Sequence, residues 1–259
     1  MTYDNFTVID CASVVNFTRS NGSDAQMPKD CHVRNLRVIG QLVSALPIAI
    51  LIDGNGCSVE LTAEGAFNAN KRVLINRGAG NKVTIKGDPV LQVPWVNVSA
   101  NATDSEVVLD VGALTTQPTV SSDNHLVEVN GPRTKVKARL NGVQNVGYIR
   151  INSGGPNSEV KDCNIVAPAS LAASAMVRMS TDDCHITDNT FRDEAGLMHA
   201  IRMITGCDRN FVTNNVIRRA AGAAVQIDSG ASGNIVVNNS LNGATITNSG
   251  TGSTVSPNY

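Results

Sequence analysis

The chain has 259 residues, and its 21 Lys and Arg residues nearly balance its 22 Asp and Glu residues, which leaves a formal net charge of -1 at pH 7. Because so small a charge gives no general attraction to nucleic acid or to an anionic membrane, we expect neither as a partner. Aromatic residues make up only 3% of the chain and charged residues 17%. The abundance of Val, Ile, Asn, Gly, Ser and Thr instead favours strands and turns over helices.

The N-terminal sequence lacks the basic and apolar regions of a secretory signal, so we expect no signal peptide. No run of residues approaches the ~20 apolar residues that a membrane span needs, so we also expect no membrane insertion. If the protein leaves the cell, we expect it to do so by another route, such as lysis or assembly into a particle, unless the sequence begins after processing.

A short phrase occurs three times near the C-terminus. It reads Ile-Thr-Asp-Asn-Thr-Phe at residues 186–191, Val-Thr-Asn-Asn-Val-Ile at 212–217 and Val-Val-Asn-Asn-Ser-Leu at 236–241. Each phrase alternates an apolar side chain with one that tolerates water, and a polar pair that can bend the chain follows. A unit of this kind cannot bury its apolar face alone, so the repeat predicts a coil of stacked rungs.

The first apolar residue of the phrase, here called the anchor, recurs through nearly the whole chain. Successive anchors lie 24 to 29 residues apart, which predicts about ten rungs. We place them at Val8, Val33, Val59, Val83, Val107, Val136, Val160, Ile186, Val212 and Val236.

A second strand, with the pattern apolar, any residue, apolar, recurs once in every period. Examples are Val127-Glu128-Val129 and Ile201-Arg202-Met203. The path from anchor to second strand lengthens at residues 113–125 and 167–174, and insertions that cluster on one face of a repeat protein are a common place for binding. We expect residues 1–247 to form the coil and residues 248–259 to form a C-terminal cap or tail.

The repeated phrases resemble the parallel β-helix repeat of the pectate-lyase-like superfamily, and most of all the tailspike and fibre proteins of bacteriophages. The resemblance implies an all-β fold, a single-stranded right-handed parallel β-helix of about ten rungs. It further implies three parallel sheets, inward stacks of aliphatic side chains and an asparagine ladder at one bend. Asn189, Asn215 and Asn239 match that ladder by position, and Cys163 replaces its asparagine one rung earlier.

Of the six cysteines, Cys31, Cys57 and Cys184 occupy a repeat position that other rungs fill with Asn or Ser, and Cys11 and Cys163 share a second repeat position. Equivalent Cβ atoms on stacked rungs lie about 4.7–4.9 Å apart, slightly too far for a disulfide. No CxxC pair indicates zinc. We therefore interpret the cysteines as small, half-buried thiols and expect no metal and no cofactor.

The second strands place polar residues at equivalent outward positions. We predict that Arg150, Arg178 and Arg202 form a column between Glu128 and Gln226. One interpretation is a solvated sheet face with stacked guanidinium planes. The other is a ligand site that grips an acidic saccharide or the carboxylates of a partner subunit.

The residue just before each second strand forms an apolar column that includes Trp95, Leu126, Tyr148 and Met176. If the next residue faces inward, alternation along the strand predicts that these side chains face outward. An exposed apolar stripe indicates an interface, and three copies about a parallel axis would cover it in a homotrimer. The rival interpretation is a track on which Trp95 and Tyr148 stack against sugar rings.

A glycosidase needs two carboxyl groups about 5–10 Å apart on one surface. Weak candidates for such catalytic residues are Glu128, Asp183, Asp193 and Glu194, and nothing in the sequence separates them from solvated surface acids.

Two functions remain. The first is a tailspike-like or fibre-like component exposed on a phage particle, trimeric, in contact with other virion proteins and bound to a host cell-surface polysaccharide. The second is a polysaccharide lyase or glycoside hydrolase that acts on an acidic glycan.

Overall fold

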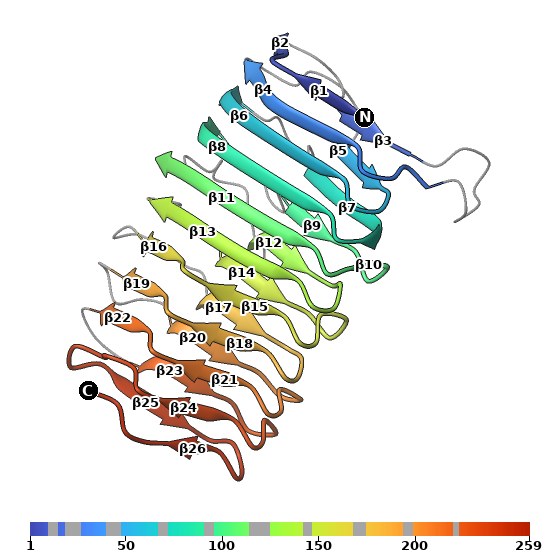
Figure 1. Ribbon diagram of the computed structural model, residues 1–259. Helices are drawn as coiled ribbons and strands as arrows, with labels where there is room; N and C mark the ends of the chain where they lie inside the picture. The colour runs from blue at the N-terminus through green and yellow to red at the C-terminus, as the bar shows by residue number, and fades with distance from the viewer. Residues whose placement is uncertain are drawn as a thin grey trace.

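The computed structural model describes residues 1–9, 15–18, 27–39, 48–66, 72–90, 96–113, 125–141, 147–167, 175–193, 199–219 and 223–259. These residues form 26 strands and no helix, and the paired strands run parallel to one another. The strands stack in one long coil, with the N-terminus at one end and the C-terminus at the other (Figure 1). Among these residues no helix is long and apolar enough to cross a membrane. The predicted all-β coil is confirmed.

The larger sheet contains 15 strands, and its main path passes through one strand per rung. That path has eleven strands, so the number of rungs differs slightly from the ten expected. The path runs β1 (Thr2–Asp4), β4 (His32–Ile39), β6 (Ser58–Ala66), β8 (Lys82–Val90), β11 (Glu106–Ala113), β13 (Lys135–Asn141), β15 (Glu159–Lys161), β18 (His185–Thr187), β21 (Phe211–Thr213), β24 (Ile235–Val237) and β26 (Thr254–Val255).

Toward the C-terminus each rung of this sheet divides at a bend into two strands. The strands that follow the bend are β16 (Asn164–Ala167), β19 (Thr190–Asp193) and β22 (Val216–Arg219), and β2 (Thr7–Ile9) takes the same place at the N-terminus. Because β13 pairs with both β15 and β16, one hydrogen-bonded sheet runs around the bend and supplies two faces of the coil. The resemblance implied three sheets; the structure has three faces built from two hydrogen-bonded sheets.

The smaller sheet contains 11 strands and forms the third face. Its main path runs β3 (Val15–Phe17), β5 (Ile48–Asp53), β7 (Arg72–Ala79), β9 (Val96–Val98), β12 (His125–Val129), β14 (Gly147–Ile151), β17 (Ala175–Met179), β20 (His199–Met203), β23 (Ala223–Ile227) and β25 (Thr245–Asn248), and β10 (Ala102–Thr103) pairs with β7. The predicted second strands therefore exist and stack in the predicted order. In the last of them, β25, Ile246 pairs with Val225 after a shift of register.

The nine anchors from Val33 to Val236 form one continuous inward stack, as predicted. Each is at most 6% exposed, and each pairs in register with the next. Val8 was misplaced: it pairs with Val38, and Tyr3 pairs with the anchor Val33. At the other end, the tail continues the stack, because Val255 pairs with Val236.

The bend before each anchor, here called the first bend, needs a left-handed backbone. The residue three places before each anchor from Val33 onward, and before Val255, has a φ between 50° and 71°. Gly, Asn and Asp tolerate this conformation best, which explains their abundance between the strands. The positions are Asp30, Gly56, Gly80, Asp104, Arg133, Asn157, Asp183, Arg209, Gly233 and Gly252.

The predicted asparagine ladder lies buried at the second bend, which is the bend that divides each C-terminal rung of the larger sheet into two strands. The Asn215 amide Nδ2 donates to Asn239 Oδ1 at 2.9 Å, and the Asn215 Oδ1 accepts from Asn189 Nδ2 at 2.9 Å. Cys163 begins the ladder by donating its backbone N–H to Asn189. Asn258 extends it by one rung beyond Asn239, so the tail covers the last turn of the coil.

Three residues of the predicted apolar column do not lie on the outside of the coil. Leu126, Tyr148 and Met176 are each 0% exposed within the single chain, so the prediction that they face outward is wrong. Pairing passes from His125–Gly147 directly to Val127–Ile149, so the regular alternation does not extend to these residues. The Tyr148 hydroxyl donates to the Val166 carbonyl of β16 at 3.3 Å. These side chains therefore fill the corner where the smaller sheet meets the larger one.

Candidate functional site

The predicted polar column lies on the outer face of the smaller sheet. Glu128 pairs in register with Arg150, Arg150 with Arg178, Arg178 with Arg202, and Arg202 with Gln226. All five side chains are half-buried, while their neighbours on both sides along each strand are buried. Strand pairing therefore presents this column to solvent on consecutive rungs, about 4.8 Å apart.

A second outward column lies two residues further along each strand, and sequence analysis missed it. Its presence follows from the same alternation that predicts the first column. The Asn152 amide donates to Asn130 Oδ1 at 2.8 Å, and the Ser180 hydroxyl donates to the Ile151 carbonyl at 3.2 Å. We call the two columns together the outer strip: Glu128, Arg150, Arg178, Arg202, Gln226, Asn130, Asn152, Ser180, Ile204 and Asp228.

Three arginines on consecutive rungs repel one another. At the rung spacing, each neighbouring pair costs about 1 kcal/mol in water and up to about 3 kcal/mol at a protein surface. Arg202 is neutralised within the chain: its Nε and Nη2 donate to Asp228 Oδ2 at 3.1 and 2.9 Å. Gln226 donates to the other oxygen of Asp228 at 3.1 Å, which fixes that carboxylate in place.

Arg150 has no such partner. In the described part of the chain, its Nε is buried and makes no hydrogen bond. Glu128, its neighbour on the preceding rung, instead accepts a hydrogen bond from Asn97 at 3.2 Å. The outer strip thus contains three arginines and two carboxylates, Glu128 and Asp228. The formal charge of its own side chains is therefore one positive charge.

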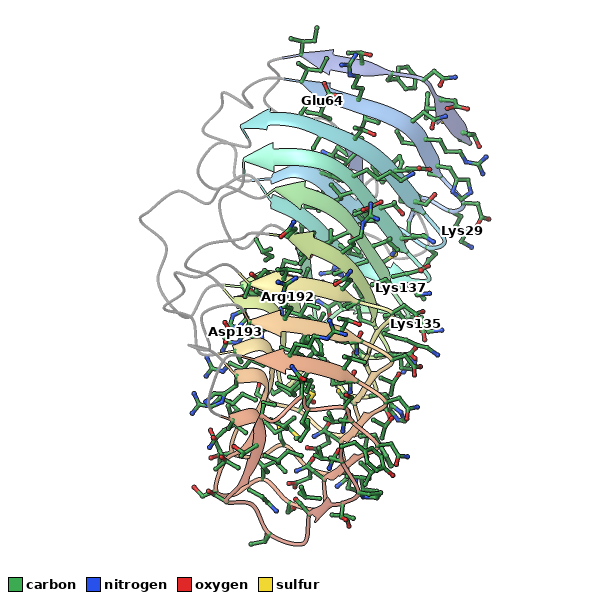
Figure 2. The ribbon with its side chains drawn as sticks, turned by 90° about the vertical axis from the view of Figure 1, so that its left-hand side faces the viewer. Lys29, Glu64, Lys135, Lys137, Arg192 and Asp193 are labelled. Atoms are coloured by element: carbon green, nitrogen blue, oxygen red, sulfur yellow. The ribbon has the colours of Figure 1, made fainter. Side chains whose placement is uncertain are left out.

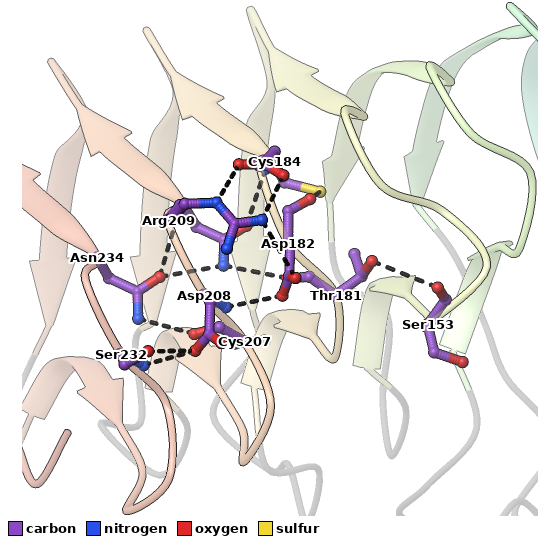
Figure 3. A network of polar contacts seen from close by, with 11 residues as sticks. Ser153, Thr181, Asp182, Cys184, Cys207, Asp208, Arg209, Ser232 and Asn234 are labelled. Carbon is purple, nitrogen blue, oxygen red and sulfur yellow. Dashed lines mark hydrogen bonds and ion pairs between the residues drawn. The ribbon is translucent and has the colours of Figure 1, made fainter. Parts of the chain in front are cut away.

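Asp183, a candidate catalytic residue, lies at the first bend in a turn network. Arg209 donates to both of its carboxylate oxygens, from Nε to Oδ1 at 2.9 Å and from Nη2 to Oδ2 at 2.8 Å. Arg209 also donates to Asp182, which lies beside it in Figure 3. This hydrogen-bonded arginine lowers the pKa of the Asp183 carboxyl. Asp182 accepts from the Asp208 backbone, and Asp208 accepts from Ser232 on the next rung. The arrangement indicates a structural role in holding successive turns together.

The remaining candidate acids lie apart from Asp183. Asp193 ends β19 in the larger sheet, where it is 1% exposed. Burial of the Tyr148 hydroxyl, and after it the nearby Asp193, raises the pKa of Tyr148. Figure 2 places Asp193 across the sheet from Lys135 and Lys137. Glu128 lies on the smaller sheet, and Glu194 is outside the described residues. The structure therefore gathers the three described acids on no common strand or bend.

Of the predicted interface residues, Leu126, Tyr148 and Met176 fill the corner described above, and Trp95 is outside the described residues. The lengthened segments at 113–125 and 167–174 also lie almost entirely outside them. Among the predicted site residues that the structure describes, Glu128 and the three arginines lie together on one outward face.

A hollow of about 580 Å³ lies at the first bend beside the larger sheet. Two ion pairs lie in its wall, Lys82 with Glu106 at 3.0 Å and Arg133 with Asp104 at 2.6 Å, and Lys135 and Glu159 also line it. The Arg133 hydrogen bond lowers the pKa of Asp104 to about 2. These two pairs hold four of the six charged side chains of the hollow in contacts within the chain.

Residues 119–259 match the family described as the right handed beta helix region. This match spans more than half of the chain, so the protein belongs to the right-handed β-helix family. Comparison with curated protein sequences finds no match.

Several solved structures are similar in fold to the chain. One is a mutant tailspike protein of E. coli bacteriophage HK620 in complex with a pentasaccharide, with 13% identity and a TM-score of 0.47, covering 91% of this chain and 51% of that one. A second mutant of that tailspike, in complex with a hexasaccharide, has 14% identity and a TM-score of 0.44, covering 91% of this chain and 61% of that one. The chain thus spans between about half and three fifths of the tailspike chains it matches.

Proposed function

We propose that this β-helix binds a host cell-surface polysaccharide along the outer strip. The observation that carries the proposal is the in-register column from Glu128 to Gln226, with Asn130, Asn152 and Ser180 beside it. Guanidinium and amide donors on consecutive rungs suit an extended polymer of hydroxyl and carboxylate groups that lies along the coil axis. A net positive charge favours an acidic polymer over a basic one.

The proposal includes a tailspike-like or fibre-like role in a phage particle, as a trimer beside other virion proteins. Leu126, Tyr148 and Met176, three residues of the apolar column that motivated the trimer, are buried and do not support it. The trimer therefore stands as a separate prediction. Light scattering at micromolar concentration should give about three times the 27.2 kDa chain mass; a mass of one chain would contradict this part and leave glycan binding to be judged by its own test.

The alternative function, a lyase or hydrolase for an acidic glycan, is supported by no comparable observation. Its candidate acids lie on different parts of the coil, as described above, and Asp183 is held by Arg209. It stays a prediction that one assay can decide. Incubation with bacterial capsule or lipopolysaccharide should release no new reducing ends and no unsaturated uronates if the protein only binds.

The test of binding is a panel of bacterial surface polysaccharides, acidic and neutral, measured by retardation in affinity electrophoresis. We expect retardation by at least one of them, and we expect the double variant Arg150→Gln, Asn152→Ala to weaken it. The matched control is Lys137→Gln, which removes a positive charge from the outer face of the larger sheet. Equal retardation of the double variant and the wild type would refute the location of the site, and no retardation by any polysaccharide would refute the function.

A further inference from the structure

The strip contains an internal example of how one of its arginines binds a carboxylate. Arg202 reaches forward to Asp228, which lies on the next rung and two residues beyond Gln226, the register partner of Arg202. Both Nε and Nη2 of Arg202 point to a single oxygen, at 3.1 and 2.9 Å. The place next to an arginine of this column, one rung forward and two residues on, is therefore a carboxylate position.

The same construction locates the equivalent place beside each of the other two arginines. Arg150 pairs with Arg178, and two residues beyond Arg178 lies Ser180. Arg178 pairs with Arg202, and two residues beyond Arg202 lies Ile204. At the position that Asp228 holds beside Arg202, the chain has the short hydroxyl of Ser180 beside Arg150. It has the apolar side chain of Ile204 at the equivalent position beside Arg178. Neither can supply the negative charge that Asp228 supplies.

The missing carboxylate concerns Arg150 alone. It is half-buried, and no residue of the described ranges forms a hydrogen bond or ion pair with it. Its Nε is shielded from solvent, so the terminal guanidinium nitrogens are the atoms that a ligand would meet. Ser180 is small, and its hydroxyl donates to the Ile151 carbonyl and not to a group of the next column, so it brings no negative charge to Arg150.

We infer that a carboxylate of the bound polysaccharide occupies the place over Ser180 and accepts hydrogen bonds from the Nη atoms of Arg150, as Asp228 does from Arg202. This inference rests on the proposed function and adds the ligand class, a uronate or another carboxylated sugar. Glu128 on the preceding rung repels a second carboxylate there, and Asp228 already fills the corresponding place beside Arg202. The site thus accepts one carboxylate at the centre of the strip.

The test installs the missing carboxylate in the protein itself. In Ser180→Asp, the new side chain should pair with Arg150 and exclude the ligand, whereas Arg150→Gln removes the donor. Ser249→Asp is the matched control, because it adds the same charge on the rung after Asp228 and leaves Arg150 unchanged. The probes are an oligogalacturonate of defined length and the same oligosaccharide after reduction of its carboxyl groups, titrated calorimetrically at low ionic strength. Circular dichroism and thermal melting check the fold of every variant.

We expect the wild type and Ser249→Asp to bind the acidic probe, and both Ser180→Asp and Arg150→Gln to bind it roughly tenfold to a hundredfold more weakly, the range for a charged hydrogen bond. Ser180→Asp should also melt no lower than the wild type, since the new carboxylate meets a positive charge. If that variant does not fold, Arg150→Gln alone decides.

Unchanged binding by Ser180→Asp and Arg150→Gln would overturn the inference. So would equal affinity of the wild type for the acidic and the reduced probe, or no binding of the acidic probe at all. The proposed function fails separately, when no polysaccharide of the wider panel is retarded.

Discussion

Val160 is a residue whose place in the coil the repeat alone predicts. It is 0% exposed and pairs with Val136 on one side and Ile186 on the other. Val160→Asp would place a charge between these apolar neighbours, at a cost of several kcal/mol in an interior site. We expect insoluble protein or a large drop in the melting temperature. Val108→Asp, at an outward position of β11, should have little effect; similar melting of both variants would refute the register.

The cysteine thiols provide a second test at this scale. Cys163, Cys184 and Cys207 are buried, and burial raises the pKa of each thiol to about 12. We expect a thiol reagent at pH 8 to label half-buried Cys31 in the native protein and to spare these three, as measured by mass spectrometry of peptides. Full labelling of the three without denaturant would contradict their burial.

The same thiols give a direction for the pH dependence of stability. An unfolded cysteine has a pKa of about 8.5, so the raised pKa values in the folded protein favour the neutral thiol. Their contribution to the free energy of unfolding is fully present below about pH 8.5. It is lost as the pH rises toward 12, because the unfolded chain can then ionise while the folded chain cannot.

At the level of elements, the asparagine ladder joins the two strands of each C-terminal rung. Asn215 makes hydrogen bonds to Asn189 and Asn239 and donates to the Ile186 carbonyl at 2.8 Å. Asn215→Leu leaves these groups buried without partners, at about 1–3 kcal/mol for each. We expect a clear loss of stability in denaturant unfolding. Asn164→Leu, at an exposed position of β16, is the control, and an equal effect of both variants would show that the ladder contributes nothing.

A second ladder was missed because its residue types vary. At the first bend, Cys184 donates its backbone N–H to Asn210, Asn210 donates to Asn234, and Asn234 donates to Ser253. Sequence analysis recognised that Cys, Asn and Ser share this position. The hydrogen bonds at this position could not be predicted, because no repeated asparagine phrase marks them. At the second bend, by contrast, the repeated Asn-Asn pair indicates a ladder.

Across the whole molecule, the sequence predicts the order of the rungs, the inward stack and the outward arginine column. These features follow from a period of two along strands and from a repeat of nearly constant length. The corner column fails because two consecutive residues, Leu126 and Val127, are both buried, which is not expected where one face of a strand meets solvent. Side chains alternate between the two faces only within the regular part of a strand. Tyr148 lies outside that part, at the corner where its hydroxyl reaches the Val166 carbonyl of the larger sheet.

The pairing of Arg202 with Asp228 could not be predicted for a related reason. It joins residues 26 apart on different rungs, and the sequence shows only that both face outward. The distinction between a neutralised arginine and Arg150, which lacks a partner in the described residues, requires the register and the second column together.

The central claim is that a polysaccharide lies along the outer strip. The most direct measurement is a crystal structure of the wild-type chain soaked with a fragment of a surface polysaccharide that retards it. We predict electron density for the sugar across the outer faces of β12, β14, β17 and β20, in contact with Arg150 and the amides of Asn130 and Asn152. Density confined to the larger sheet, or to the hollow beside Lys82 and Glu106, would contradict the account.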